Sequence, residues 1–441
     1  MARRAIVRLA CRGISFASLG PVHGVMEAMS ESVCVVGLGY VGLPTAAMLA
    51  SRGWKVIGVD TNDDVVQTIN GGAPHIAEPD LDVLVQAAIA AGRLRAATYP
   101  VPAENYIIAV PTPVTTQHVP DLSYVEAASR AVARVLNRGS LVVIESTCPI
   151  GTTERVAQWM AEVRPDLTFP HQMGEEADVC IAYCPERVLP GQVLRELMQN
   201  DRVIGGMTPR CARRALALYD SFVLGDCMLT DARTAEMVKL AENAFRDVNI
   251  AFANELANLC DLFGLDVWTL IALANRHPRV NILRPGPGVG GHCIPVDPWF
   301  IVHSAGVEAR LIRTAREVND DRPGRIVSHI LKVMREKRGR VLACLGLAYK
   351  ADVGDVRESP ALKIVHALAR KQIGEILVVE PCVADLPPDL SRFPYVRLVK
   401  LDEALRSADV IAVLVDHTVF KRIDRNLLQT KLVIDTRGIW R

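Results

Sequence analysis

One stretch, residues 32 to 60, constrains the fold of this chain more than any other. An apolar run typical of a buried strand is followed at once by the pattern GLGYVG. A helical pattern from Ala46 to Arg52 comes next, and a second strand pattern from Lys55 to Val59 ends on an acidic residue, Asp60. A glycine triplet alone is weak evidence, but this order of strand, glycines, helix, strand and acid predicts a dinucleotide-binding α/β domain.

Each residue of this pattern has a chemical reason to be there. Glycines let the backbone turn tightly and let a pyrophosphate reach the N-terminus of the following helix. The carboxylate of Asp60 would accept hydrogen bonds from the adenosine ribose and repel a 2′-phosphate, so NAD is expected rather than NADP. A glycine-rich turn that binds no cofactor is the alternative. The predicted cofactor contacts in this stretch are Gly37, Gly39, Tyr40, Val41, Gly42 and Asp60.

Composition excludes several classes of function. The chain has 441 residues, enough for two or three domains. Its net charge of +1 gives no excess of positive charge that would bind nucleic acid or an anionic membrane. No apolar run approaches the roughly 20 residues of a membrane helix. The 11 cysteines are scattered and never in CxxC spacing, which argues against a disulfide framework or a zinc ribbon and predicts reduced thiols in a cytoplasm. No metal is expected.

The first 28 residues differ from the rest. They carry five arginines, one acidic residue and no clear periodicity. A transit peptide has this composition. A segment added by a start codon assigned too far upstream would have it too. We expect an extension that does not fold, with Met26 or Met29 as candidate starts.

Further strand patterns follow at α/β spacing: Asn105 to Val110, Leu141 to Ile144 and Val179 to Tyr183. Ligands of an open parallel sheet gather at the carboxyl ends of its strands, so the residues after these strands are site candidates. Each of them also has a simpler reading, as a turn residue or a surface ion pair. The candidates are Thr112 and Thr147 for the nicotinamide half, and Glu186 with Arg187 as a base and an anion clamp.

A long helical pattern runs from Thr230 to Phe263. Polar residues recur on one face of it, and Asn249 and Asn254 add more amides among apolar neighbours. Such a pattern usually marks a helix face that is exposed to solvent. The alternative is that these polar residues line a site. The polar residues that share a face by their spacing are Lys239, Asn243 and Arg246.

The segment from Leu283 to Asp297 contains four glycines, two prolines before the last glycine pair, and one cysteine, Cys293. Glycines let the backbone approach a ligand closely, while His292 and Asp297 beside the thiol would move protons or favour a thiolate. This setting suits a nucleophile. The alternative is a buried cysteine in a Pro/Gly-rich turn.

A second α/β unit is expected in the C-terminal part, after helical patterns from Val267 to Ala274 and from Ala309 to Val318 and a basic linker around residues 335 to 340. Its first strand ends in GLAYK, which lacks the glycine triplet and argues against a second dinucleotide site. Lys350 and Arg357 would instead hold a diphosphate. No internal repeat is visible in the sequence. The expected strands are Val341 to Leu345, Ile376 to Val379, Val410 to Val415 and Leu432 to Ile434.

Together these motifs carry a resemblance. The order GLGYVG, PTP, EST, CPER, AEMVKLAENAF, GVGGHC with VDP, and GLAYKADVGDVRESP resembles the UDP-glucose/UDP-mannuronate dehydrogenase family over essentially residues 32 to 441. In the UDP-glucose branch, lysine typically stands where this chain has Val296 and serine where it has His292. The resemblance therefore points to the amino-sugar branch.

The resemblance implies an α/β fold class with two Rossmann-like doubly wound domains joined by a central helical domain with one long helix, through which the family forms homodimers. It implies a cytoplasmic enzyme of bacterial surface polysaccharide synthesis. The expected domains are an extension (1–28), an NAD-binding Rossmann-like domain (29–226), a helical dimerisation domain (227–325) and a UDP-sugar-binding Rossmann-like domain (326–441).

The resemblance further implies an NAD-dependent four-electron oxidation of a UDP-sugar at C6, with UDP-N-acetyl-D-mannosamine expected first and UDP-N-acetylglucosamine or UDP-glucose as alternatives. A two-electron hydroxyacid dehydrogenase and a non-catalytic nucleotide-sugar sensor are the competing hypotheses. The implied catalytic residues are Cys293 as nucleophile, Lys239 and Asn243 as oxyanion donors, Lys239 or Asp297 as the first base, and Glu186, Thr147 and Asp297 for the hydrolytic water. The implied substrate contacts are Arg187, Val188, Lys239, Asn243, Arg246, His277, Arg279, Gly290, Tyr349, Lys350 and Arg437, and Arg357 is expected to reach NAD.

Overall fold

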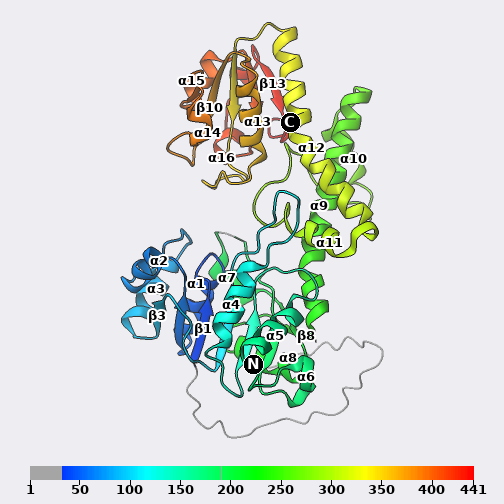
Figure 1. Cartoon of the computed structure of the whole chain (residues 1–441). Coiled ribbons are helices and arrows are strands. Elements are labelled where there is room, and N and C mark those ends of the chain that lie inside the picture. Colours follow the sequence, from blue (N-terminus) through cyan, green and yellow to red (C-terminus); the bar gives the residue numbers. More distant parts are fainter. Residues whose placement is uncertain (1–31, 190) are drawn as a thin grey trace. The chain divides into compact units, whose positions relative to one another are not determined.

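The computed structural model describes residues 32–189 and 191–441 (Figure 1). The chain divides into two compact units, and the boundary between them along the sequence lies between Leu240 and Ala241. The expected N-terminal extension and its candidate starts lie outside the described residues. Within the described part, no helix is long and apolar enough to cross a membrane.

The first unit is built on an eight-stranded sheet with the order β3-β2-β1-β4-β5-β6-β7-β8. The first six of these strands are parallel, β7 is antiparallel to β6, and β8 is parallel to β7. Since the strand order reverses between β1 and β4, ligands are expected at the carboxyl ends of these two strands. The strands are β1 Ser32–Val36, β2 Lys55–Val59, β3 Leu94–Ala97, β4 Asn105–Ile108, β5 Leu141–Ile144, β6 Cys180–Tyr183, β7 Arg202–Gly206 and β8 Cys227–Asp231.

Helices cover both faces of this sheet because successive strand residues point to opposite sides. Val33 and Val35 of β1 pack into one core with α1, α3 and α8, and Cys34 and Val36 pack into the other with α4 and α5. The helices are α1 Gly42–Ser51, α2 Asp63–Asn70, α3 Leu81–Ala90, α4 Ser123–Ala133, α5 Thr152–Val163, α6 Pro170–Met173, η1 Gly174–Glu176, α7 Val193–Gln199 and α8 Pro209–Tyr219.

The central region is helical. The long helix α9, Ala232–Phe263, leads from the first unit into the second and confirms the predicted long helix. It is followed by α10 (Val267–Ala274), α11 (Asp297–Ala305), η2 (Gly306–Glu308) and α12 (Arg310–Glu336).

The prediction ended α12 too early, at Val318, and assigned its last residues to a linker. The residues after Val318 are weak helix formers by local propensity, and Pro323 lies among them. The helix continues because Ile326, Val327 and Ile330, together with Met334, recur at helical spacing and pack against the second sheet. Tertiary burial outweighs local propensity here.

The second unit contains a five-stranded parallel sheet with the order β11-β10-β9-β12-β13. Its strands are β9 Val341–Leu345, β10 Glu375–Val379, β11 Val396–Leu398, β12 Val410–Val413 and β13 Leu432–Asp435. Its helices are α13 Pro360–Arg370, α14 Pro388–Ser391, α15 Leu401–Ser407, α16 Thr418–Lys421 and η3 Arg425–Leu428. The predicted fold class, two doubly wound domains joined by a helical region with one long helix, is confirmed.

Candidate active site

The glycine loop after β1 shows why each glycine is needed. Gly37 has φ +93°, and a Cβ on it would lie 2.4 Å from the carbonyl oxygen of Ala109. A Cβ on Gly42 would lie 1.8 Å from the oxygen of Gly37. The fold itself therefore requires these two glycines. A Cβ on Gly39 would meet nothing within 4 Å, so this position is open to a ligand.

Asp60 at the end of β2 faces the same loop. Its carboxylate accepts from the backbone N–H of Leu38 at 3.1 Å and from that of Asn62 at 3.0 Å. Helix α1 begins with no side-chain cap and no acidic residue in its first turn, which favours an anion at its N-terminus. With Tyr40 and Val41 half-buried or exposed between the glycines, this arrangement fits the pyrophosphate and ribose of NAD.

Thr112 and Thr147 follow the neighbouring strands β4 and β5, and both side chains are half-buried. The hydroxyl of Ser146 donates to Val110 O at 2.7 Å and joins the two loops. Both threonines therefore lie at the sheet edge that carries the glycine loop, as their positions in the sequence predicted.

Glu186, after β6, belongs to a buried ion pair that the sequence did not indicate. Its carboxylate lies 2.8 Å from the guanidinium of Arg202, and both side chains are almost fully buried. The same carboxylate accepts the N–H of Arg187 at 2.6 Å. The Arg187 guanidinium donates to the carbonyl of Asp201, and Val188 is half-buried beside it.

Sequence reasoning gave no role to Glu145, which directly follows β5 and precedes Ser146. Its carboxyl group is buried and accepts the hydroxyl of Tyr219 at 2.6 Å. Burial raises the pKa of Glu145 to about 7, although Arg202 opposes this shift. An acid at the end of a fully apolar strand was the available signal, but only the tertiary structure places Arg202 and Tyr219 around it.

The polar face of α9 presents Lys239 and Asn243 one turn apart. Lys239 is mostly buried, and Arg246 is exposed. The amide Nδ2 of Asn243 donates to Asp297 Oδ2 at 2.5 Å. The structure thus brings two of the predicted catalytic residues into direct contact.

Cys293 stands at the turn that leads into α11. Its carbonyl accepts the N–H groups of Val296 at 3.0 Å and of Asp297 at 2.9 Å. Asp297, the first residue of the helix, is buried, whereas Cys293 is exposed. Among the described cysteines only Cys293 and Cys382 are exposed. The thiol is therefore not packed in the hydrocarbon core, as the alternative hypothesis required.

The glycines before Cys293 serve packing within the second unit. A Cβ on Gly290 would lie 2.6 Å from Pro360, and one on Gly291 would lie 3.1 Å from the ring of Tyr349. A Cβ on Gly288, which has φ +140°, would meet Pro360 at 3.1 Å. These protein contacts account for the glycines that the sequence had suggested for close approach of a ligand.

The loop after β9 supplies the other predicted groups of this unit. His292 faces it, with its Nε2 4.0 Å from Asp355, while Arg357 forms an ion pair with the same carboxylate at 2.7 Å. The N–H of Tyr349 donates to Asp355 O at 3.1 Å, and Lys350 beside it is half-buried.

Three more predicted substrate contacts lie in the second unit. Arg437, after β13, donates to Asp416 at 2.7 Å, at the sheet edge that also carries Tyr349 and Lys350. His277 and Arg279 follow α10 and are exposed, and the Arg279 N–H donates to His277 Nδ1 at 3.3 Å.

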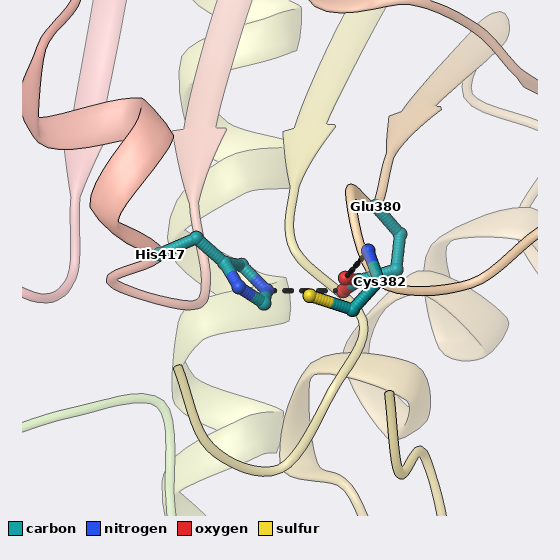
Figure 2. A group of neighbouring side chains, drawn as sticks. All are labelled: Glu380, Cys382 and His417. Carbon is teal, nitrogen blue, oxygen red and sulfur yellow. Dashed lines mark hydrogen bonds and ion pairs between the residues drawn. The ribbon is translucent and has the colours of Figure 1, made fainter. Parts of the chain in front are cut away.

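Glu380, Cys382 and His417 have the composition of a metal site, and Figure 2 shows them side by side. The N–H of Asp352 donates to His417 Nδ1 at 2.9 Å, so the imidazole proton is on Nε2, which lies 3.2 Å from Glu380. A metal ion would require that nitrogen without its proton. The group is a closed hydrogen-bond network and does not suit a cation.

Comparison with known proteins gives a consistent result. Three models of the UDP-glucose/GDP-mannose dehydrogenase family match the chain: the NAD binding domain at residues 31–223, the central domain at 233–321 and the UDP binding domain at 343–441. The chain belongs to this family. The family membership inferred from the motifs is confirmed, and so is the NAD cofactor. The chain is an NAD-dependent oxidoreductase with a UDP-binding domain.

Individual relatives are similar over almost their whole length. The NDP-N-acetyl-D-galactosaminuronic acid dehydrogenase of Ralstonia nicotianae is 59% identical over 410 residues, 93% of this chain and 96% of the relative. The UDP-N-acetyl-D-mannosamine dehydrogenase of Escherichia coli K12 is 56% identical over 418 residues, 93% of this chain and 99% of the relative. The solved UDP-D-ManNAc dehydrogenase from Pyrococcus horikoshii superposes with a TM-score of 0.82 and 40% identity, covering 93% of this chain and 96% of its own.

In this member of the family, the match to the NAD-binding model spans β1 to β7 and contains the glycine loop and Asp60. The UDP-binding model spans β9 to β13 and contains Tyr349, Lys350 and Arg437. The roles of the individual site residues stay a prediction. The predicted boundaries between the domains stay a prediction.

Proposed function

We propose that this enzyme oxidises UDP-N-acetyl-D-mannosamine at C6 to UDP-N-acetyl-D-mannosaminuronate, for bacterial surface polysaccharide synthesis in the cytoplasm. The exposed thiol of Cys293 carries the proposal, because its turn is joined to Asp297 and, through that carboxylate, to Asn243. The names of the relatives support an N-acetylhexosamine.

In the first oxidation, Lys239 or Asp297 takes the proton of the C6 hydroxyl directly or through water. NAD, when bound, accepts the hydride in each of the two oxidations. Because Asp297 accepts a hydrogen bond from Asn243, its orientation is fixed for this transfer.

In the second oxidation, the Cys293 thiolate adds to the C6 aldehyde as a thiohemiacetal, and loss of a hydride then gives a thioester. A thiolate is nucleophilic at a pH where a hydroxyl is not. Lys239 and Asn243 stabilise the negative oxygen, and such prepositioned donors are worth about 3 kcal/mol each. Water held by Thr147 and Asp297, and activated by Glu186, hydrolyses the thioester and returns the thiol.

The remaining predicted residues bind substrate and cofactor. Arg187 and Val188 contact the sugar, and Arg246, His277 and Arg279 reach the sugar or its phosphates. The Gly290 backbone lies near the ligand, and the uridine diphosphate is held by Tyr349, Lys350 and Arg437. Arg357 reaches an NAD, including one bound by the facing subunit.

The enzyme is further proposed to form a homodimer through α9. Exposed apolar side chains recur along this helix at two steps of seven residues and then at steps of three and four, the spacing of a helix-packing stripe. The stripe consists of Phe245, Phe252, Leu259, Leu262 and Phe263. A charge at its centre, Phe252→Glu, is expected to give a monomer by light scattering, whereas the exposed Leu427→Glu in the UDP-binding domain leaves the dimer intact.

A panel of UDP-sugars tests the reaction. UDP-N-acetyl-D-mannosamine is expected to yield two NADH per sugar, and to be preferred over UDP-N-acetylgalactosamine, UDP-N-acetylglucosamine and UDP-glucose. Cys293→Ser is expected to bind NAD normally and to form no acid. Cys382→Ser, which removes the other exposed thiol, is the matched control and retains activity.

Each competing hypothesis predicts a different outcome. One NADH per sugar from the wild type would indicate a two-electron dehydrogenase. NADH formation with none of the sugars would leave the sensor hypothesis, and ordinary acid production by Cys293→Ser would refute the thioester route.

A further inference from the structure

The face of α9 that carries Asn243 continues down the helix as a buried polar row. Asp247 and Asn254 follow Asn243 by four and eleven residues, so at about 100° per residue the three side chains lie within about 40° of one another. Asp247 and Asn254 are fully buried. Buried polar groups need partners, and these partners lie on α12 and on the loop before Cys293.

The hydrogen bonds of this row run in one direction. Gly286 lies near the start of the segment 283–297 that carries Cys293, here called the thiol loop. It donates its N–H to Asn254 Oδ1 at 2.9 Å. Asn254 Nδ2 donates to Asn319 Oδ1 at 2.9 Å, and Asn319 Nδ2 donates to Asp247 Oδ1 at 2.8 Å. The chain starts at a backbone donor and ends at a carboxylate acceptor, so neither amide can flip without breaking a bond at each side.

Charged groups of α12 fix both ends of this row. Arg316, also fully buried, donates to Asp247 and to Asp320. Arg322 Nε donates to the carbonyl of Gly286 at 3.1 Å. Both polar groups of the Gly286 peptide backbone are therefore held, the N–H by α9 and the C=O by α12.

The same helix α9 thus contacts the thiol loop on both sides of Cys293. Asn254 holds Gly286, seven residues before the thiol, and Asn243 holds Asp297, four residues after it. Between these two contacts the loop packs on Pro360 and Tyr349. A change at either amide is therefore transmitted to the sulfur through a short, close-packed segment.

We propose that Asn254 and Asn319 are positioning residues that orient the Gly286 peptide and so place Cys293 for attack on the aldehyde carbon. The inference rests on the proposed function, because it assumes the thioester route. It predicts that the two amides matter for the second oxidation far more than for the first, which does not use the thiol.

The test compares Asn254→Leu, Asn319→Leu and the double variant with Asn249→Ala. Asn249 lies on the same helix, but among the residues that the structure describes its amide donates only to Phe245 O of that helix, at 2.7 Å. For the three leucine variants, the rate of acid formation from the C6 aldehyde is expected to fall roughly 10- to 100-fold, which is the usual cost of a misplaced reacting group. NADH per sugar then drops from two towards one, the KM for the UDP-sugar changes little, and alkylation of Cys293 by iodoacetamide changes in rate.

Because the amides act in series, the double variant is expected to be no worse than the poorer single variant. Where Asn254→Leu does not fold, Asn319→Leu carries the test, since within the described residues the hydrogen bonds of Asn319 go to Asn254 and Asp247 of α9 and not to the loop. Two NADH per sugar and an unchanged alkylation rate in a folded Asn319→Leu would overturn the inference. So would an equal fall in both oxidations. Cys293→Ser, measured alongside, separates this result from failure of the proposed function, which acid formation by that variant would show.

Discussion

The two sheets have the same backbone turn after β1 and after β9. After β1, the N–H of Gly37 donates to Val59 O at 2.8 Å, and after β9 the N–H of Gly346 donates to Val379 O, also at 2.8 Å. Both glycines have positive φ, 93° and 98°. A Cβ on Gly346 would lie 2.4 Å from Val415, as one on Gly37 would clash with the neighbouring strand.

A carboxylate at the end of the second strand supports each turn. Asp60 accepts from Leu38 N at 3.1 Å, and Glu380 accepts from Leu347 N at 2.7 Å and Ala348 N at 3.0 Å. The structure therefore contains a repeat that the sequence analysis did not find, because the two turns share geometry and few residue types.

The two turns differ in what surrounds them. Gly39 is open and α1 begins three residues later, whereas its counterpart Ala348 is buried and α13 begins only at Pro360. Glu380 is buried. Its carboxylate also contacts the ring of His417 (Figure 2). One turn can thus serve a dinucleotide or be closed by side chains, depending on the space left beside it.

The largest expected effect separates the roles of the two carboxylates. Glu380→Ala leaves the N–H groups of Leu347, Ala348 and Cys382 without their acceptor, so the free energy of unfolding should fall by about 3 to 5 kcal/mol. NAD affinity should not change. Chemical denaturation and NAD titration measure both, with Glu375→Ala, a half-buried carboxylate at the start of β10, as the control. An unaltered denaturation midpoint for Glu380→Ala would contradict this structural role.

Asp60→Ala should show the opposite pattern. Loss of the ribose acceptor is expected to weaken NAD binding by about 10- to 100-fold, while UDP binding stays the same. Asp63→Ala, at the exposed start of α2, is the control. The measurement is titration of each nucleotide separately, and equal NAD affinity in variant and wild type would mean that the cofactor site is misplaced.

Within the first turn, Gly39→Ala should reduce NAD affinity about tenfold without changing stability, because the added methyl group meets only open space in the protein. Gly37→Ala should instead destabilise the fold, since both its φ and its neighbours exclude a Cβ. Thermal unfolding together with NAD titration distinguishes them. A marked loss of stability in Gly39→Ala would show that this position is not reserved for a ligand.

The smallest effect concerns pH. Burial raises the pKa of Glu145 to about 7, so it contributes stability below its unfolded pKa near 4.5 that is lost as pH rises through 7. Burial alone would also raise the pKa of Glu380, but hydrogen bonds from His417 and backbone N–H groups lower it, so its contribution is lost only as pH falls.

Glu145→Gln is therefore expected to gain about 1 kcal/mol relative to wild type between pH 6 and pH 8. Glu380→Gln is expected to be less stable than the wild type at neutral pH, and this difference in stability should shrink as pH falls below 4.5. Unfolding curves across this range measure both slopes, and a slope of the same sign for the two variants would contradict the assignment.

Local pattern was enough to predict most elements next to the site. The ranges Lys55–Val59, Leu141–Ile144, Val341–Leu345 and Val267–Ala274 coincide with β2, β5, β9 and α10. These segments are apolar or periodic and end at turn residues, so local and tertiary preferences agree. The strands β3, β7 and β8 were missed, because LRAA, RVIGG and CMLTD have little alternation and are extended only by pairing with neighbours.

The sequence by itself determined the glycine triplet with its acid, the order of the motifs, and the residue types at the proposed thiol site. Only the tertiary structure decided which polar residues are buried together. Glu186 with Arg202, Glu145 with Tyr219, and Asn254 with Gly286 come from positions far apart in the chain. Their pairing depends on strand order and helix packing, which set distance and desolvation, and no local spacing encodes either quantity.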